Sequence, residues 1–278
     1  MKFRTFVPLL TYPDASTEAT VRNAAAAARL IGDELHALAL EADIPQVKSA
    51  LSSALTKLPK MIQSAERMSA QNRETLLAQA HAEAEAQGLD LTTSVAKVQP
   101  AMLGEVAAGH ARYFDMVLLG WTRGHPGVRM VAEALLLGSG RPIMLVPDEM
   151  PVQRFGRVSI AWDGSRVAAR AVSDARVLLE RADEVSVITV TDEKPLKEEA
   201  AGERLAENLR KSGLKAQFSA VRAEDGPIAE TLQRHAVELG TNLLVMGGYG
   251  HSRLRDFVLG GATEGVFSDL RLPVLLSH

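Results

Sequence analysis

Residues 241–263 read TNLLVMGGYGHSRLRDFVLGGAT, an apolar run that leads directly into two groups of glycines. The run Leu243 to Met246 has the length and composition of a buried strand. Glycines begin where this strand would leave its sheet, and the pair Gly260-Gly261 follows a polar loop that carries arginines. Open parallel sheets bind ligands beyond the carboxyl ends of their strands, and glycine lets backbone N–H groups approach an anion. The sequence therefore predicts an anion site at the end of this strand.

Strand and helix patterns alternate on both sides of this run. The expected strands cover residues 158–162, 185–190, 216–221, 243–246 and 273–276, and the expected helices cover residues 166–179, 194–212 and 227–240. Strands that alternate with helices imply right-handed crossovers and a parallel sheet. The sequence therefore predicts a doubly wound α/β fold.

The first half of the chain repeats this order. The matching pairs are DMVLLG at 115–120 with NLLVMG at 242–247, and PIMLV at 142–146 with PVLL at 273–276. Repeated order on this scale indicates an internal duplication, and the polar, Pro-containing segment 147–155 suits a linker. We therefore expect two tandem Rossmann-like domains, residues 1–148 and 154–278, each with a five-stranded parallel sheet.

One helical segment, about residues 46–88, distinguishes the first half from the second. Its apolar stripe consists of Val47, Leu51, Leu55, Leu58 and Ile62. Pro59 either opens a new helix or kinks an existing one, so we expect two consecutive helices that lengthen the crossover after the second strand. A solvated amphipathic extension and a partner-binding face are the two interpretations, and the first is favoured because such helical faces are common.

Composition and charge exclude several classes of protein. The net charge of −3 argues against a nucleic-acid partner, because phosphate contacts need clustered Lys and Arg. The chain has no cysteine, which excludes disulfides and thiolate chemistry. No apolar run reaches the roughly 18 residues that a membrane span needs. We expect a cytoplasmic protein without a membrane partner.

Three glycines at a fixed spacing carry a resemblance to a known family. Gly247, Gly250 and Gly260 form Gly-x-x-Gly, nine residues, Gly, between an apolar strand and a final Pro-led strand. Together with Asp163 after the first strand of that half, this order resembles the universal stress protein family, and its extent over both halves resembles a tandem member. The resemblance implies doubly wound five-stranded sheets and a role in stress response or signalling. It also implies ATP as ligand, with magnesium as a candidate companion, because the family's ATP-binding branch carries this spacing.

The resemblance also implies roles for individual residues. Asp163 and the backbone of Val190 would meet the adenosine part, and Met246 would help to floor the ribose and the first phosphate. Backbone N–H groups of the later glycines would bind the phosphates. The full expected site is Ala161, Asp163, Val190, Met246, Gly247, Gly250, His251, Arg253, Gly260, Gly261 and Thr263.

Several of these residues have a second interpretation. Gly261 stands where the family has Ser or Thr, so the backbone donor survives without the hydroxyl, and Thr263 could replace it only if the turn allows. Arg253 is either a phosphate partner or a solvated loop charge. His251 reads more simply as polar surface, because no partner is visible near it. Asp163 begins Asp-Gly-Ser, which also suits a turn and a helix cap.

The first half lacks the glycine spacing. Gly124 is four residues after Gly120, and Gly138 reads as a helix stop. We therefore expect a degenerate first domain and one nucleotide site per chain. The Pro-led strands near Ile143 and Val274 are edge candidates, so we expect the halves to form an internal pseudo-dimer. A further homodimer and an unidentified protein partner stay open.

Other chemistry is sparse in this sequence. It contains no Gly-x-x-x-x-Gly-Lys-Ser/Thr P-loop, no metal-ligand spacing of histidines and no evident catalytic residue. The leading hypothesis is a nucleotide-binding stress-response module that is not an efficient enzyme. The alternatives are an adaptor or small-ligand-binding protein that binds no nucleotide, and a very slow ATP hydrolase.

Overall fold

The computed structural model describes residues 2–45, 58–192, 200–223, 226–250 and 261–278. The chain divides into two compact units. The first unit consists of Met1–Gly120 and His125–Arg141, and the second of Trp121–Gly124 and Pro142–His278. Two segments that the sequence analysis assigns to the first domain, residues 121–124 and 142–148, therefore belong to the second unit. The division into domains 1–148 and 154–278 stays a prediction.

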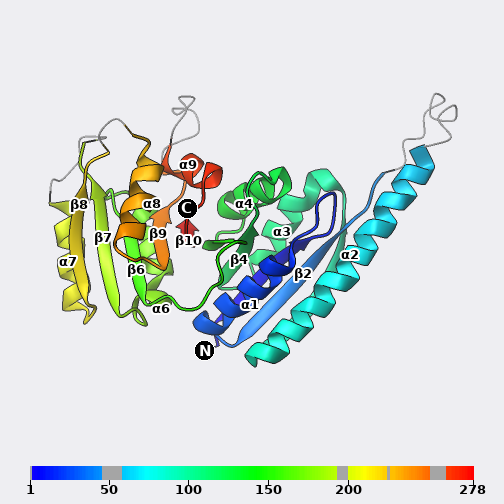
Figure 1. The fold of residues 1–278 in the computed structure, drawn as a ribbon, viewed down its shortest axis with the longest axis horizontal. Helices are drawn as coiled ribbons and strands as arrows, with labels where there is room; N and C mark the ends of the chain where they lie inside the picture. Colours follow the sequence, from blue (N-terminus) through cyan, green and yellow to red (C-terminus); the bar gives the residue numbers. More distant parts are fainter. Residues whose placement is uncertain (1, 46–57, 193–199, 224–225, 251–260) are drawn as a thin grey trace. The chain divides into compact units, whose positions relative to one another are not determined.

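The first unit has a parallel sheet with strand order β3-β2-β1-β4. Of these strands, Figure 1 labels β2 and β4. Its strands are β1 (Arg4–Leu10), β2 (Glu34–Ala42), β3 (Asp90–Val98) and β4 (Met116–Trp121). Its helices are α1 (Glu18–Ile31), α2 (Leu58–Gln87), the 3₁₀ helix η2 (Pro100–Met102), α3 (Leu103–Ala111) and α4 (Pro126–Gly138). Strand β4 is buried along its whole length, as its continuous apolar sequence predicts, whereas β3 is mostly exposed.

The second unit has strand order β5-β10-β9-β6-β7-β8. Its strands are β5 (Ile143–Pro147), β6 (Arg157–Ala161), β7 (Glu184–Val190), β8 (Ala216–Val221), β9 (Leu243–Gly247) and β10 (Val274–Ser277). Its helices are α5 (Arg166–Asp174), α6 (Arg176–Leu179), α7 (Ala201–Lys211), α8 (Ile228–Glu238) and α9 (Ala262–Ser268). Strands β6 to β10 pair in parallel, and β5 pairs antiparallel with β10, with Leu145 opposite Val274.

The predicted doubly wound α/β fold is confirmed. From the central strand β6 the chain continues to β7 and β8 on one side and then to β9 and β10 on the other. The helix expected over residues 194–212 ends at Lys211, close to its predicted end. Gly213 follows with a φ of 88°, which is accessible mainly to glycine, and its N–H bonds the carbonyl of Arg210 at 2.9 Å. The fifth strand that the sequence assigns to the first half is β5, which here lies in the second unit.

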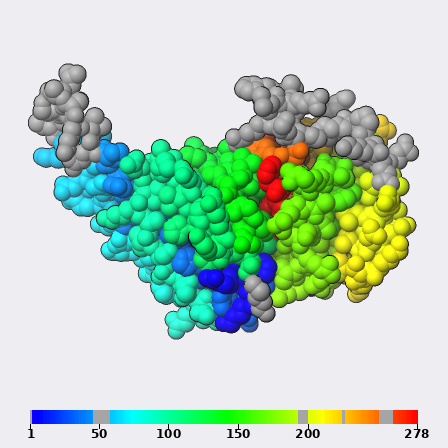
Figure 2. Space-filling model, turned by 180° about the vertical axis from the view of Figure 1, so that it is seen from behind, coloured from blue at the N-terminus to red at the C-terminus, as the bar shows by residue number. Residues whose placement is uncertain are grey.

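Helix α2 is a single helix with Pro59 at its amino-terminal end. Residues 46–57, where a preceding helix was expected, lie outside the described residues. The buried residues of α2 are Ser69, Leu76, Ala80 and Ala84, a narrow stripe that packs on α1 and β2. The amino-terminal end of α2 projects from its unit (Figure 2, light blue), and Met61 there is 65% exposed. A partner-binding role for this surface stays a prediction.

None of the helices in the described parts of the chain is long and apolar enough to cross a membrane.

Candidate functional site

The carboxyl ends of β6, β7 and β9 meet at one edge of the second unit's sheet. Strand β6 lies between β9 and β7, and the chain leaves it first toward β7. The gap between β6 and β9 is therefore the point where the strand order reverses, which is where doubly wound sheets bind ligands. The three strands end at Ala161, Val190 and Gly247.

The turn after β6 is built by Asp163 and Ser165. The Asp163 carboxylate accepts a hydrogen bond from the backbone N–H of Ser165 at 2.9 Å, and Gly164 between them has φ 72°. The hydroxyl of Ser165 then accepts from the N–H of Ala168 at 3.2 Å and caps α5. Asp163 is exposed. It therefore acts in the turn, as the second interpretation of this residue expects, and remains accessible to a ligand.

Gly247 and Gly250 lie against the first turn of α5. A Cβ on Gly247 would lie 2.6 Å from Val167 Cγ2 and 2.7 Å from the backbone nitrogen of Ala168. A Cβ on Gly250 would lie 2.7 Å from the same Val167 atom. These distances are too short for any side chain, so both glycines permit close approach of the loop to the helix. The loop that would hold an anion is thus packed against a helix amino terminus.

Tyr249, between these glycines, has an unusual backbone conformation. Its φ is 49°, the left-handed region that non-glycine residues rarely adopt. Its N–H donates to the hydroxyl of Thr263 at 3.1 Å, and Thr263 is buried in the first turn of α9. In this conformation Thr263 holds the loop after β9. The sequence analysis assigned no role to Tyr249. Its position as a non-glycine residue within Gly-Gly-x-Gly could have indicated the unusual backbone conformation.

Gly261 precedes α9 as its N-cap residue, with φ −63° and ψ 150°. A Cβ built there meets no atom of the described residues within 4 Å. The backbone angles and the space among those residues therefore suit Ser or Thr, the types that the family resemblance leads one to expect.

The remaining predicted site residues divide into two sets. Met246 and Val190 are buried in their strands, so their backbones are the groups available to a ligand, and Ala161 is partly exposed. The predicted residues His251, Arg253 and Gly260, like the loop residue Arg255, lie outside the described residues. Their roles stay predictions.

Two buried polar atoms occur at this edge. Trp162 Nε1, next to Asp163, and Ser277 Oγ, on β10 opposite Gly247, have no hydrogen-bond partner among the described residues. Buried polar groups in folded proteins are nearly always hydrogen-bonded, so we expect each of these two atoms to have a hydrogen-bond partner outside the described residues.

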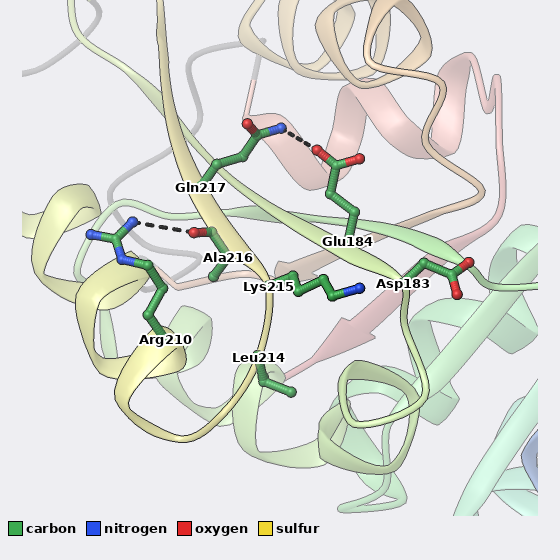
Figure 3. Close-up of a pocket in the computed structure, with 7 residues that line it drawn as sticks. All are labelled: Asp183, Glu184, Arg210, Leu214, Lys215, Ala216 and Gln217. Carbon is green, nitrogen blue, oxygen red and sulfur yellow. Dashed lines mark hydrogen bonds between the residues drawn. The ribbon is translucent and has the colours of Figure 1, made fainter.

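A surface hollow lies at the opposite edge of the sheet (Figure 3). Its lining residues are Asp183, Glu184, Arg210, Leu214, Lys215, Ala216 and Gln217. Gln217 Nε2 donates to Glu184 Oε1 at 2.6 Å, and Arg210 donates to the carbonyl of Ala216 at 3.2 Å. These residues begin β7 and β8, whereas parallel sheets bind ligands at the strand ends. We therefore place the candidate site at the carboxyl edge, not in this hollow.

Comparison with known proteins gives a family match for the second half. Residues 154–278 match the universal stress protein family. Universal stress protein Slr1230 of Synechocystis sp. is 27% identical over 173 residues, which cover 58% of this chain and 57% of that relative. The match thus spans little more than half of the relative's length.

Solved structures of similar fold cover nearly the whole chain. A universal stress protein from Archaeoglobus fulgidus DSM 4304 matches with a TM-score of 0.69 at 17% identity, over 98% of this chain and 97% of that chain. A Pseudomonas aeruginosa UCBPP-PA14 protein assigned to the same family matches with a TM-score of 0.56 at 16% identity, over 99% and 93%. At these identities the likeness shows the fold. The family match over residues 154–278 agrees with the resemblance seen in the glycine spacing, and this half of the chain belongs to the universal stress protein family.

Proposed function

We propose that the second unit binds a nucleotide, ATP in the first instance, at the carboxyl edge of β6, β7 and β9. Binding would set the conformation or the partner choice of a stress-response protein. The observation that carries this proposal is the glycine loop after β9, because Gly247 and Gly250 bring its backbone against the start of α5 at the sheet's switch point. Backbone N–H groups in such a loop suit phosphate oxygens.

The expected affinity follows from the number of such donors. Each N–H bond to an ionised oxygen contributes roughly 1.5–3 kcal/mol. About three of them total roughly 4.5–9 kcal/mol, and association costs several kcal/mol or more, so micromolar binding also needs favourable contacts with the adenosine. The adenosine would lie toward Asp163, which is exposed, and the backbone of Val190. In this arrangement the base and the phosphates occupy different strand ends of one edge.

Magnesium receives no protein ligands in this proposal. Within the described ranges, no group of three or more His, Asp or Glu side chains is placed to hold a metal ion. A magnesium ion that accompanies ATP would be bound mainly through the phosphates and waters, which need no cage of protein ligands. The proposed module is a binder, because Asp163 would lie at the adenosine end of the nucleotide and not beside the γ-phosphate, where a water would have to be oriented. A very slow hydrolase remains the enzymatic alternative.

An adaptor that binds no nucleotide is the second candidate function. Two observations favour it. The contacts of Gly247 and Gly250 with Val167 give both glycines a packing role that needs no ligand. Asp163 already bonds the turn that begins α5. An adaptor would use the same edge, or the exposed end of α2, for a small ligand or a protein.

Isothermal titration calorimetry of the full chain with ATP and magnesium separates these functions. We expect one site per chain with micromolar affinity, and loss of binding in Gly250→Val, whose side chain would collide with Val167. Absence of binding at millimolar ATP would support the adaptor, and two equivalent sites would contradict a single site. Phosphate release is followed in parallel, and a rate within the roughly 1–100 per second of dedicated kinases would make the protein an enzyme.

A further inference from the structure

We propose that Trp121 is a positioning residue for the glycine loop: a row of three rings, Trp121, Phe267 and Tyr249, holds the loop after β9 in its left-handed conformation. Trp121 ends β4, yet it belongs to the second compact unit. The effect on nucleotide affinity rests on the proposed function, whereas the effect on the loop does not.

The ring row begins with Trp121. Trp121 is 5% exposed and stacks on Phe267, with ring centroids 5.3 Å apart and planes 18° apart. Phe267, 4% exposed, meets Tyr249 edge-on at 6.3 Å and 65°. Both distances lie in the range where aromatic pairs attract. Phe267 is thus in contact with an indole on one side and with the loop tyrosine on the other.

Helix α9 holds Tyr249 at two points. The ring of Tyr249 contacts Phe267, and its backbone N–H donates to the hydroxyl of Thr263 at 3.1 Å. Thr263 and Phe267 are four residues apart, so they lie on one face of the helix. The position of this face therefore determines both the ring and the backbone of Tyr249.

Such support matters because Tyr249 is strained. Its φ of 49° is unfavourable for a residue with a side chain and persists only where the surroundings over-determine it. Gly247 and Gly250 flank it against α5, so a relaxed Tyr249 would shift the loop relative to that helix. The strained residue thus lies inside the segment that carries the proposed phosphate donors.

The segment that carries Trp121 is itself fixed on both sides. The carbonyl of Trp121 accepts from the N–H of Asp148 at 3.2 Å, and the hydroxyl of Thr122 donates to the carboxylate of Asp148 at 2.6 Å. Arg123 pairs with Asp269, the residue after α9, at 3.3 Å. These bonds give the indole a defined position against α9, as a support requires.

The corresponding positions in the two sheets explain why Trp121 is free for this role. The registers place Gly120, the next-to-last residue of β4, in the position that Gly247 has at the end of β9. The sequence after Gly120 lacks the glycine spacing. Trp121 therefore has the position of the residue that follows Gly247 and begins the glycine loop. Instead of beginning such a loop, it is buried and supports the loop after β9.

The test is amide hydrogen exchange of Tyr249, measured by NMR on the full chain without nucleotide. Trp121→Leu keeps an apolar side chain but removes the ring face, and we expect exchange at Tyr249 to accelerate about tenfold while core amides of β9 are unchanged. Trp121→Phe should restore slow exchange. The matched control is Phe155→Ala, which removes another buried ring of the second unit before β6 and should leave Tyr249 unaffected. Unchanged exchange in Trp121→Leu, or equal acceleration in Phe155→Ala, would overturn the proposal.

ATP titration of a double-mutant cycle then tests the link to binding. Glycine adopts a φ of 49° without strain, so Tyr249→Gly should make ATP affinity independent of Trp121. We expect Trp121→Leu to weaken binding about tenfold in the natural background and less than twofold in the Tyr249→Gly background. Equal losses in both backgrounds would contradict positioning through Tyr249. If the natural chain binds no ATP, the proposed function fails, and the exchange experiment still decides the role of Trp121.

Discussion

The first and second units contain the same sheet frame, but their carboxyl edges differ. Both frames start in the same register, with Arg4 opposite Glu34 and Arg157 opposite Glu184. Leu10 therefore has the position of Asp163. Leu10 is buried, whereas Asp163 is exposed. The frame alone does not decide whether an edge is available to a ligand.

In the first unit, α2 closes the edge with its own polar side chains. The hydroxyl of Ser69 lies 2.6 Å from that of Thr11, which follows β1, and accepts from the N–H of Ala42 at 2.8 Å. The amide of Asn72 donates to the carbonyl of Thr11 at 3.0 Å. The backbone and hydroxyl groups that a ligand would contact there are thus already bonded by the protein.

A charged pair adds to this closure. Arg73 of α2 bonds the carboxylate of Glu41, which is 6% exposed at the end of β2, and Lys97 lies 3.6 Å from the same carboxylate. Buried polar atoms without a hydrogen-bond partner among the described residues occur in both units: Trp162 Nε1 and Ser277 Oγ in the second, and Gln79 Oε1 of α2 in the first. We propose that the bonds of α2 at this edge leave the second unit as the one that binds a ligand.

The largest effect is expected from removing β5, which pairs antiparallel with β10. Expression of residues 152–278 uncovers the edge of β10, and unpaired apolar edges associate, so we expect a homodimer or an aggregate. The control is the full chain, in which β5 covers this edge of β10. Analytical ultracentrifugation distinguishes them. A monomeric 152–278 fragment would show that β10 needs no partner strand and would argue against an internal pseudo-dimer.

The next largest effect is expected from replacing Gly247, whose matched control is Gly120 at the corresponding position of the first unit. A Cβ at Gly247 collides with Val167 at 2.6 Å, and one at Gly120 collides with Thr20 at 2.4 Å. Both Gly→Ala variants should lose roughly 1–3 kcal/mol of stability through overpacking. We expect ATP affinity to fall about 100-fold, equivalent to roughly 2.7 kcal/mol, in Gly247→Ala alone. Urea unfolding and calorimetry measure the two quantities, and equal ATP affinity in both variants would remove the proposed difference between the edges.

Closure by α2 is tested with Ser69→Ala. This change leaves the Thr11 hydroxyl and the Ala42 N–H without Ser69 as their partner, so we expect a loss of about 1–3 kcal/mol in the free energy of unfolding. Ser64→Ala, at an exposed position of the same helix, is the control and should change stability by less than about 0.5 kcal/mol. Similar values for both variants in urea unfolding would mean that these bonds do not hold α2 on the edge.

The first unit should also respond to pH through His36. This half-buried side chain packs against both Phe6 and Phe114, and burial, followed by the charges of His110 and Arg4, lowers its pKa. The unfolded chain therefore binds the proton more tightly, so stability is highest above about pH 6.5 and falls as the pH falls through the folded-state pKa. Urea unfolding at several pH values should show this fall, reduced in His36→Gln. An identical pH dependence in that variant would assign the effect to other groups.

The smallest effect is expected from Gly261→Ser. The backbone angles suit serine, and a hydroxyl there caps α9 and adds a donor for phosphate. We expect a few tenths of a kcal/mol in stability, because glycine is itself a tolerated N-cap, and about a fivefold gain in ATP affinity. Thermal unfolding and calorimetry measure both. Weaker binding in this variant would mean that the position must lack a side chain.

The fold was predictable where the signal is local. Apolar runs such as Leu243 to Met246, the alternation of strands with helices and the stop at Gly213 follow from residue type and spacing, and the structure confirms the doubly wound α/β fold. The sequence identified β5 and β10 only as candidate edge strands and did not predict that they pair with each other. Strand pairing between distant segments depends on contacts that no local pattern encodes.

The candidate site was predictable only in part, for a similar reason. The glycine spacing located the loop, but its contacts with Val167 depend on the packing of α5. Tyr249 was missed because a left-handed tyrosine is stabilised by Thr263 and Phe267, which are distant in sequence. The closing role of Ser69 was missed because a polar residue on a long helix normally faces solvent.

Photo-crosslinking with 8-azido-ATP, followed by mass mapping of labelled peptides, tests most directly the claim that one edge is open and the other closed. We expect label in peptides around Asp163, Val190 and Gly247, and we expect excess ATP to abolish it. Label around Thr11 or Gly120 in the first unit, or label that ATP does not displace, would contradict it.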